Sequence, residues 1–254
     1  MNYILHIETS TKVCSVALGG NGELIGYKEE ISEKYIHAER LTILINELIQ
    51  ENNIGFNDLA AIAVNKGPGS YTGLRIGVST AKGLCYALNI PLISIDSLLN
   101  LFLNFKQTFS ANNENYIVIP MIDARRDEVY TATFLDDGSV LDKTQAKIID
   151  AAFFIPYTNY NKVHLIGDGC LKFKGRFKQP NLIFHEDLLC SSSSMTNSIY
   201  KKFQKKEHEN TAYFEPFYLK DFKPFWLAVY QKNPTILSVT YFLSYYLINL
   251  SWQL

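Results

Sequence analysis

Cysteine is scarce in this 254-residue chain, and the four that occur, Cys14, Cys85, Cys170 and Cys190, lie far apart in the sequence. No two of them form a C-x-x-C pair, so the usual zinc-binding and redox-active spacings are both absent. The chain also lacks the dense cysteine pattern of small secreted domains that depend on disulfides. We therefore predict four buried thiols in a protein of the reducing cytoplasm.

An excess of either charge is missing as well. The chain has 24 Lys and Arg against 25 Asp and Glu, which gives a formal net charge of −1 at pH 7. Proteins that hold nucleic acid unaided usually carry a basic surplus, so we expect any contact with RNA to be local or shared with a partner. The segment 1–7 is too short for a signal-peptide core and has no basic residues, which again predicts a cytoplasmic protein.

Several catalytic motifs are absent too. The five histidines show no H-x-x-x-H spacing, which removes the helical zinc pair of metallopeptidases. There is no G-x-S-x-G nucleophile elbow, no Walker pattern and no G-x-G-x-x-G fingerprint. We predict no catalytic residue and no metal ligand, and we interpret His37, near a helix start, as a surface or capping residue.

What the chain does contain is a strand pattern that occurs twice. Residues 3–9 and 12–18 predict two strands joined by a tight turn, and a glycine turn and a third strand over 23–31 follow. A strand, an acidic turn and an alternating strand return over 116–134, again followed by a glycine turn. The repeat predicts a duplicated α/β fold, with the alternative that two hairpins simply look alike.

The other predicted elements alternate between helix and strand. The expected helices span 37–50, the stretch after the glycine segment up to 89, and the stretch from the serine run 191–194 to 206. The expected strands span 59–65, 92–95, 163–167 and 182–185. In the first helix the spacing of Leu41, Leu44, Ile45 and Leu48 predicts one buried face.

A glycine-rich segment, KGPGSYTGLRIG at residues 66–77, separates a predicted strand from a predicted helix. Free N–H groups at a helix start can hold an anion, so a nucleotide contact stays open as an alternative. We predict instead that Ser70 or Thr72 caps the helix. In the helix itself, Leu74, Val78, Ala81, Cys85 and Leu88 form one buried stripe.

A second stripe of this helix consists of small residues, Gly73, Gly77 and Ala81. A glycine inside a helix costs roughly 1 kcal/mol relative to alanine, so Gly77 requires a reason, and close approach of another backbone is the usual one. That backbone belongs either to this chain or to another subunit. The neighbouring polar and aromatic face, Arg75, Ser79, Lys82 and Tyr86, favours a docking helix over a catalytic one.

Two acidic residues, Glu8 and Asp123, occupy equivalent turns of the two repeats and could face one cleft. Paired acids of this kind suit a small-molecule kinase that works around Mg-ATP, which is the alternative function. Against it, Glu8 is followed by Thr9, Ser10 and Thr11, with no glycine to let a phosphate approach the backbone. Glu8, Ser10 and Thr11 are therefore only weak candidates for cofactor binding.

Two segments together resemble one protein family. The stretches ILHIETSTKVCSVAL (4–18) and NKGPGSYTGLRIGVSTAKGL (65–84) strongly resemble TsaB, also called YeaZ, and the second of them is the more specific motif. The resemblance covers roughly residues 1–222. It implies an actin/Hsp70-like (ASKHA) fold of two RNase H-like α/β halves, in agreement with the repeat.

The resemblance also implies a role. TsaB is a non-catalytic scaffold that binds the catalytic paralogue TsaD, together with TsaE, for threonylcarbamoyl transfer to the adenosine next to the anticodon of tRNA. It implies contact with tRNA only through the complex, ATP used by the assembly rather than held tightly by this chain, and a homodimer when the chain is alone. The implied partner interface comprises Gly69, Tyr71, Gly73, Arg75, Gly77, Ser79, Lys82 and Tyr86, with His37 and Arg40.

The end of the chain departs from the family pattern. We predict an N-terminal subdomain over 1–104 with the docking helices, a C-terminal subdomain over 105–222, and an atypical apolar tail over 223–254. No charged side chain follows Lys232, and the remaining 22 residues would span about 33 Å as a helix. Pro234, Asn249 and several Ser and Thr residues weigh against membrane insertion, so we predict an extension or a frame-altered end.

Overall fold

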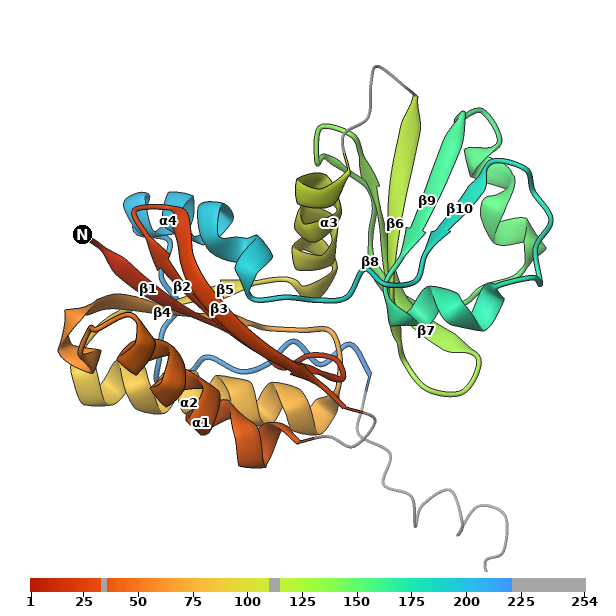
Figure 1. The fold of residues 1–254 in the computed structure, drawn as a ribbon. Helices are drawn as coiled ribbons and strands as arrows, with labels where there is room; N and C mark the ends of the chain where they lie inside the picture. The colour runs from red at the N-terminus through yellow and green to blue at the C-terminus, as the bar shows by residue number, and fades with distance from the viewer. Residues whose placement is uncertain (33–35, 110–114, 221–254) are drawn as a thin grey trace, which may run out of the picture. The chain divides into compact units, whose positions relative to one another are not determined.

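Two five-stranded sheets form the framework of the molecule (Figure 1). The computed structural model describes residues 1–32, 36–109 and 115–220. The first sheet contains β1 (Tyr3–Glu8), β2 (Val13–Gly20), β3 (Glu23–Ile31), β4 (Leu59–Asn65) and β5 (Leu92–Ile95). The second contains β6 (Tyr116–Asp123), β7 (Glu128–Leu135), β8 (Val140–Ile148), β9 (Lys162–Ile166) and β10 (Leu182–His185).

The two sheets share one topology. The strand order is β3-β2-β1-β4-β5 in the first and, read in the same sense, β8-β7-β6-β9-β10 in the second. In each sheet the first two strands pair antiparallel, and the fourth strand joins the first in parallel. This correspondence confirms the predicted duplicated α/β fold. Each sheet lies within one of the predicted halves, 1–104 and 105–222.

Long helices cover the first sheet, and short ones take their places on the second. Helices α1 (His37–Glu51) and α2 (Tyr71–Leu88) lie together on one face of the first sheet (Figure 1). The face of α1 predicted to be buried is buried, with Leu41 and Leu48 each 1% exposed. At the equivalent chain positions the second half has only the 3-10 helices η2 (Ala151–Tyr157) and η3 (Asp168–Phe173). Two further 3-10 turns are η1 (Phe56–Asp58) and η4 (Ser193–Met195).

The last helix of each half packs on the sheet of the other half. Helix α3 (Ser97–Thr108) follows the first sheet in sequence, yet its Phe105 lies in one core cluster with Val118 of β6. Helix α4 (Thr196–Gln204) follows the second sheet, yet its Ile199 packs with Ile4 and Ile93 of the first. The two halves therefore exchange their covering helices.

One α-helix and one strand are absent from the sequence-based prediction, as are the 3-10 helices. Helix α3 was missed although Leu98, Leu101, Phe102 and Phe105 follow the i, i+3, i+4, i+7 spacing of a buried helix face, and Asp96 caps it by accepting hydrogen bonds from the N–H groups of Leu98 and Leu99. Strand β8 is an edge strand with an exposed or half-buried pattern throughout, so it lacks the apolar alternation of a half-buried strand.

The four cysteines are free and buried, as predicted. Burial raises the pKa of Cys14, Cys85 and Cys170 to about 12, so these thiols stay protonated at neutral pH. Within the described ranges, no helix combines the length and apolar character needed to cross a bilayer. The tail predicted over 223–254 lies outside the described residues.

Candidate functional site

The glycine segment is fastened to the turn between β1 and β2. After β4 ends at Asn65, the chain passes through Gly67, whose φ of +107° is one that side chains rarely allow. The Ser70 N–H donates to the Ser10 carbonyl at 2.7 Å, and the Ser70 hydroxyl accepts from the Gly73 N–H at 3.2 Å. Ser70 is therefore the predicted N-cap of α2, and its backbone ties the helix start to the β1–β2 turn.

The small-residue stripe of α2 faces the same turn. A Cβ atom on Gly69 would lie 2.2 Å from the Ser10 carbonyl oxygen, and one on Gly73 would lie 2.1 Å from the Thr9 carbonyl oxygen. A Cβ on Gly77 would lie 2.2 Å from the Thr9 hydroxyl oxygen, which donates a hydrogen bond to the Gly73 carbonyl at 2.8 Å. The neighbour of these glycines is this chain's own β1–β2 turn, through backbone carbonyls at Gly69 and Gly73 and through the Thr9 side chain at Gly77, which argues against their predicted place at a partner interface.

The two partner-facing residues predicted on α1 differ from each other. His37 is 0% exposed, and its Nε2 lies 2.8 Å from the carbonyl oxygen of Thr11, to which it donates. Burial lowers the pKa of His37, which keeps the ring neutral. His37 is thus an internal residue, which corrects both the surface prediction and its place at an interface. Arg40 is half-buried at the surface and binds the carboxylate of Glu30, with Nε 2.8 Å from Oε2.

The outward face of α2 holds the remaining predicted residues. Arg75, Ser79 and Tyr86 are exposed, and Tyr86 is 88% exposed. Gly83 lies on the same side, and a Cβ atom added there would meet no heavy atom within 4 Å. Gly83 is thus a helix-interior glycine that the described part of the chain does not explain.

The chain segment after α4 runs along one edge of this face and contacts residues that were predicted to face a partner. Lys82 donates to the carbonyls of Ala212 and Phe214, at 3.1 and 2.9 Å. The ring of Tyr71 lies 4.7 Å from the ring of Tyr218, centroid to centroid. Tyr71 and Lys82 are therefore already engaged within the chain, and so is Arg75, whose guanidinium carbon lies 4.5 Å from the centroid of the Tyr71 ring. The open part of the face consists of Ser79, Gly83 and Tyr86.

The acidic residue of the first turn is enclosed. Glu8 is 0% exposed, and its Oε1 accepts hydrogen bonds from the Ser10 N–H and the Ser10 hydroxyl, each at 2.6 Å. Its Oε2 accepts from the amide of Asn100 at 3.1 Å and from the amide of Asn65. Burial raises the pKa of Glu8, while these hydrogen bonds act in the opposite direction. Four donors use the roughly four lone-pair sites of a carboxylate, which leaves none for a metal ion.

Its counterpart in the second turn is at the surface. Asp123 accepts from the Arg125 N–H at 2.5 Å and forms an ion pair with Lys172 at 2.6 Å. Ser10 and Thr11, the other weak cofactor candidates, are buried, and Thr11 accepts a hydrogen bond from the Val13 N–H. The pair Glu8 and Asp123 therefore does not present two available carboxylates, which argues against the kinase alternative.

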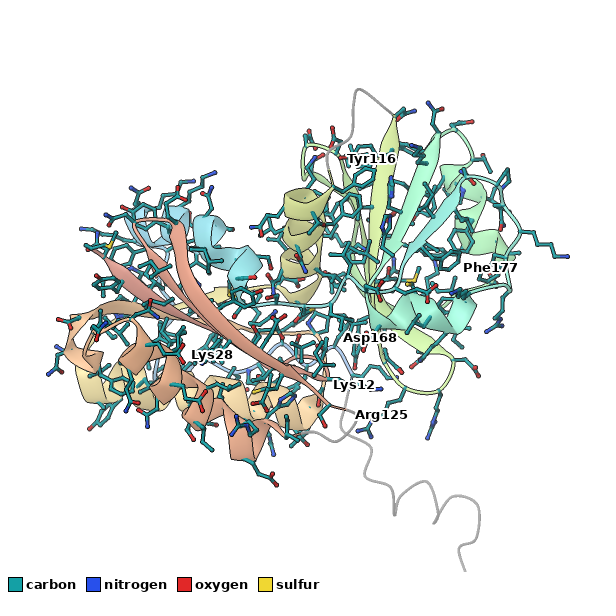
Figure 2. The ribbon with its side chains drawn as sticks, viewed as in Figure 1. Lys12, Lys28, Tyr116, Arg125, Asp168 and Phe177 are labelled. Carbon is teal, nitrogen blue, oxygen red and sulfur yellow. The ribbon has the colours of Figure 1, made fainter. Side chains whose placement is uncertain are left out.

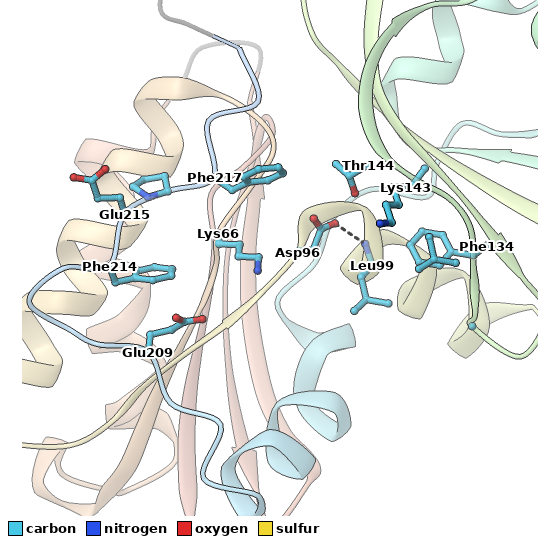
Figure 3. Close-up of a pocket in the computed structure, with 14 residues that line it drawn as sticks. Lys66, Asp96, Leu99, Phe134, Lys143, Thr144, Glu209, Phe214, Glu215 and Phe217 are labelled. Carbon is cyan, nitrogen blue, oxygen red and sulfur yellow. Dashed lines mark hydrogen bonds between the residues drawn. The ribbon is translucent and has the colours of Figure 1, made fainter.

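A pocket of about 770 Å³ lies between residues 209–217 and the β7–β8 hairpin (Figure 3). The ammonium groups of Lys66 and Lys143 and the carboxylate of Asp96 point toward it, and the rings of Phe134 and Phe217 form part of its wall. Such a lining suits a ligand that combines an apolar body with charged groups. Its residues come from separate segments, so no local motif in the sequence indicated it.

Comparison with known proteins gives a consistent answer. The family model described as "TsaD: tRNA N6-adenosine threonylcarbamoyltransferase" matches residues 30–233. The tRNA threonylcarbamoyladenosine biosynthesis protein TsaB of Haemophilus influenzae is 28% identical over 229 residues, which cover 86% of this chain and 93% of that protein. TsaB of Bacillus subtilis is 34% identical over 142 residues, 55% of this chain and 58% of its own length. The solved structure of YeaZ from Pseudomonas aeruginosa superimposes with a TM-score of 0.70 at 25% identity, covering 86% of this chain and all of that one.

Proposed function

Since the chain belongs to the TsaD family and, within it, to the TsaB (YeaZ) proteins of the ASKHA superfamily, we propose that it is a non-catalytic scaffold in threonylcarbamoyladenosine synthesis on tRNA. In this role it binds the catalytic paralogue TsaD, with TsaE joining the assembly in the cytoplasm. The assembly uses ATP, and this chain holds no cofactor tightly. When alone, the chain pairs with a second copy through the face that TsaD would otherwise cover.

The observation that carries the proposal is the outward row of α2. It offers Ser79 and Tyr86 beside the flat patch left by Gly83, with no side chain of the described residues over that glycine. A large exposed aromatic ring beside a glycine is suited to close helix packing, since tyrosine contributes strongly to protein interfaces. Support for a scaffold also comes from Glu8, whose carboxylate is used within the fold.

Reconstitution tests the function directly. We expect TsaD, TsaE, tRNA and threonylcarbamoyl-adenylate to give little modified tRNA without this chain and much more with it. The measurement is nucleoside analysis of the digested tRNA. Full modification without the chain would refute the scaffold role.

A substitution at the flat patch tests the surface. We expect Gly83→Leu to weaken both self-association and binding to TsaD at least tenfold, because the leucine side chain would occupy the space that a partner helix needs. The isolated chain should melt at or above the wild-type temperature, since leucine is the better helix former by several tenths of a kcal/mol. Light scattering across a dilution series and a thermal melt give the two readings. Unchanged association would remove α2 from the interface.

A further inference from the structure

The turn between β6 and β7 carries two consecutive arginines in a left-handed backbone conformation. The φ angles of Arg125 and Arg126 are +65° and +54°. The Glu128 N–H donates to the Arg125 carbonyl at 3.3 Å, and the Ala124 N–H donates to the Glu128 carbonyl at 3.1 Å, which closes a tight hairpin turn. Residues with such φ angles are usually Gly, Asn or Asp, because a larger side chain disfavours this conformation. Arginine is therefore an unfavourable residue for the backbone conformation at both positions.

Contacts from η3 hold this turn in place. The Lys172 ammonium donates to the carbonyls of Arg126 and Glu128, at 2.8 and 2.9 Å. It also pairs with the Asp123 carboxylate, and Asp168 accepts the Asp123 N–H at 3.1 Å. All these contacts act on the backbone or on Asp123, and none uses a guanidinium group. The turn is thus fixed while its two arginine side chains stay outside the network.

The guanidinium groups of the turn are exposed and, within the described part of the chain, unpaired. Both arginines are exposed, and across residues 1–32, 36–109 and 115–220 neither guanidinium has a hydrogen-bond or ion-pair partner. Lys172 already pairs with Asp123, which leaves the exposed Asp127 and the half-buried Glu128 as the acids beside the two arginines. The β1–β2 turn adds a further cation, Lys12, which acts electrostatically on Asp168 and lies in the same region of the molecule as Arg125 (Figure 2).

We propose that the Arg125–Arg126 turn binds the phosphate backbone of RNA, which gives this chain a direct contact with tRNA in the assembly. The identity of the RNA rests on the proposed function. Guanidinium groups match phosphate oxygens in geometry and charge. A projecting hairpin tip suits an extended backbone better than a small nucleotide, which needs a concave site, and neither arginine lines the pocket of Figure 3. The net charge of −1 agrees with a contact that works only within a complex.

The double variant Arg125→Asn/Arg126→Gly separates binding from folding. Asn and Gly each tolerate a left-handed φ better than arginine, so we expect the melting temperature to hold or rise. Affinity of the assembled complex for tRNA should fall about eightfold per lost phosphate contact at 0.1 M salt, and the salt dependence should become shallower by about 0.9 for each. Fluorescence anisotropy with labelled tRNA over a salt series measures both effects.

Two further variants make the result decisive. Arg176→Gln/Lys178→Gln removes the same charge from exposed positions outside the turn and should leave affinity near the wild-type value. Asp127→Asn leaves both arginines in place, removes the adjacent negative charge and should strengthen binding. An equal loss of tRNA affinity in the two double variants would mean that only net charge matters. A loss of ATP binding with tRNA binding intact would indicate a nucleotide site. Either outcome overturns the inference.

The test also distinguishes this inference from the proposed function. If the wild-type chain does not assemble with TsaD in light scattering, the scaffold proposal fails. If it assembles, and the turn variant in the complex binds tRNA as tightly as the wild type, only the RNA contact fails.

Discussion

The Gly77→Leu variant is expected to melt well below the wild-type chain, even at concentrations where no dimer forms. A Cβ atom alone would lie 2.2 Å from the Thr9 hydroxyl and 3.4 Å from the Thr9 Cβ, so the helix and the β1–β2 turn would have to separate. Overpacking of a closed contact costs roughly 1–3 kcal/mol, and here the Thr9–Gly73 hydrogen bond is threatened as well. We expect a loss of about 3 kcal/mol, or roughly 6–12 °C in a chain of this size.

The matched control is Gly83→Leu, the same change six residues further along the same helix. Nothing lies within 4 Å of its added Cβ, so it should not destabilise the isolated chain. The pair reverses the expectation drawn from the sequence, in which Gly77 was the residue that meets a partner. Equal melting temperatures for the two variants would show that the contact with Thr9 is not closed in solution.

Replacing Glu8 with alanine is expected to have an effect of similar size. The change leaves the Ser10 N–H and the amide groups of Asn65 and Asn100 without their acceptor in a buried site. Each unsatisfied buried donor costs about 1–3 kcal/mol, so the free energy of unfolding should fall by about 3 kcal/mol or more. Urea denaturation of the two proteins at one pH measures the difference. The control is Glu29→Ala, an exposed carboxylate with two serine donors, which should lose less than about 1 kcal/mol.

The difference in stability between the wild-type chain and Glu8→Ala should depend on pH. Burial raises the pKa of Glu8 in the folded chain above its unfolded value near 4.3, so the folded state binds this proton more tightly. Its contribution to stability is fully present below the unfolded pKa and is lost as pH rises through the folded pKa. The wild-type advantage over Glu8→Ala should therefore shrink as pH rises toward neutrality. An advantage that grows with pH would mean that the hydrogen bonds from Ser10, Asn65 and Asn100 outweigh burial.

Local sequence patterns predicted most of the helices and strands, but not which residues each helix face contacts. The periodicity of α2 identified its buried stripe, because apolar spacing is a local property. The same periodicity grouped Gly73, Gly77 and Ala81 in a second stripe without saying that this stripe meets Thr9, since that contact joins residues distant in sequence. His37 was misplaced for the same reason: its burial depends on the Thr11 carbonyl, which no helical pattern reveals.

The candidate site shows this limit more clearly. The motif at 65–84 led to the prediction of a docking helix, yet three of its glycines face the chain's own β1–β2 turn, and Lys82 is bound to residues 212 and 214. The two arginines at the β6–β7 turn lie in the segment 116–134 that the repeat pattern identified, but their significance lies in backbone angles and in Lys172, which is 46 residues further along. Only the folded chain brings these residues together.

The exchange of covering helices has a consequence for how this protein can be divided. A cut between α3 and β6 would follow the boundary of the repeat, yet each fragment would end in a helix whose apolar side belongs to the other fragment's sheet. Leu101 and Phe105 would be left facing water on one fragment, and Ile199 on the other. The two repeats are therefore not independent folding units. Each half needs a helix of the other half to cover its sheet.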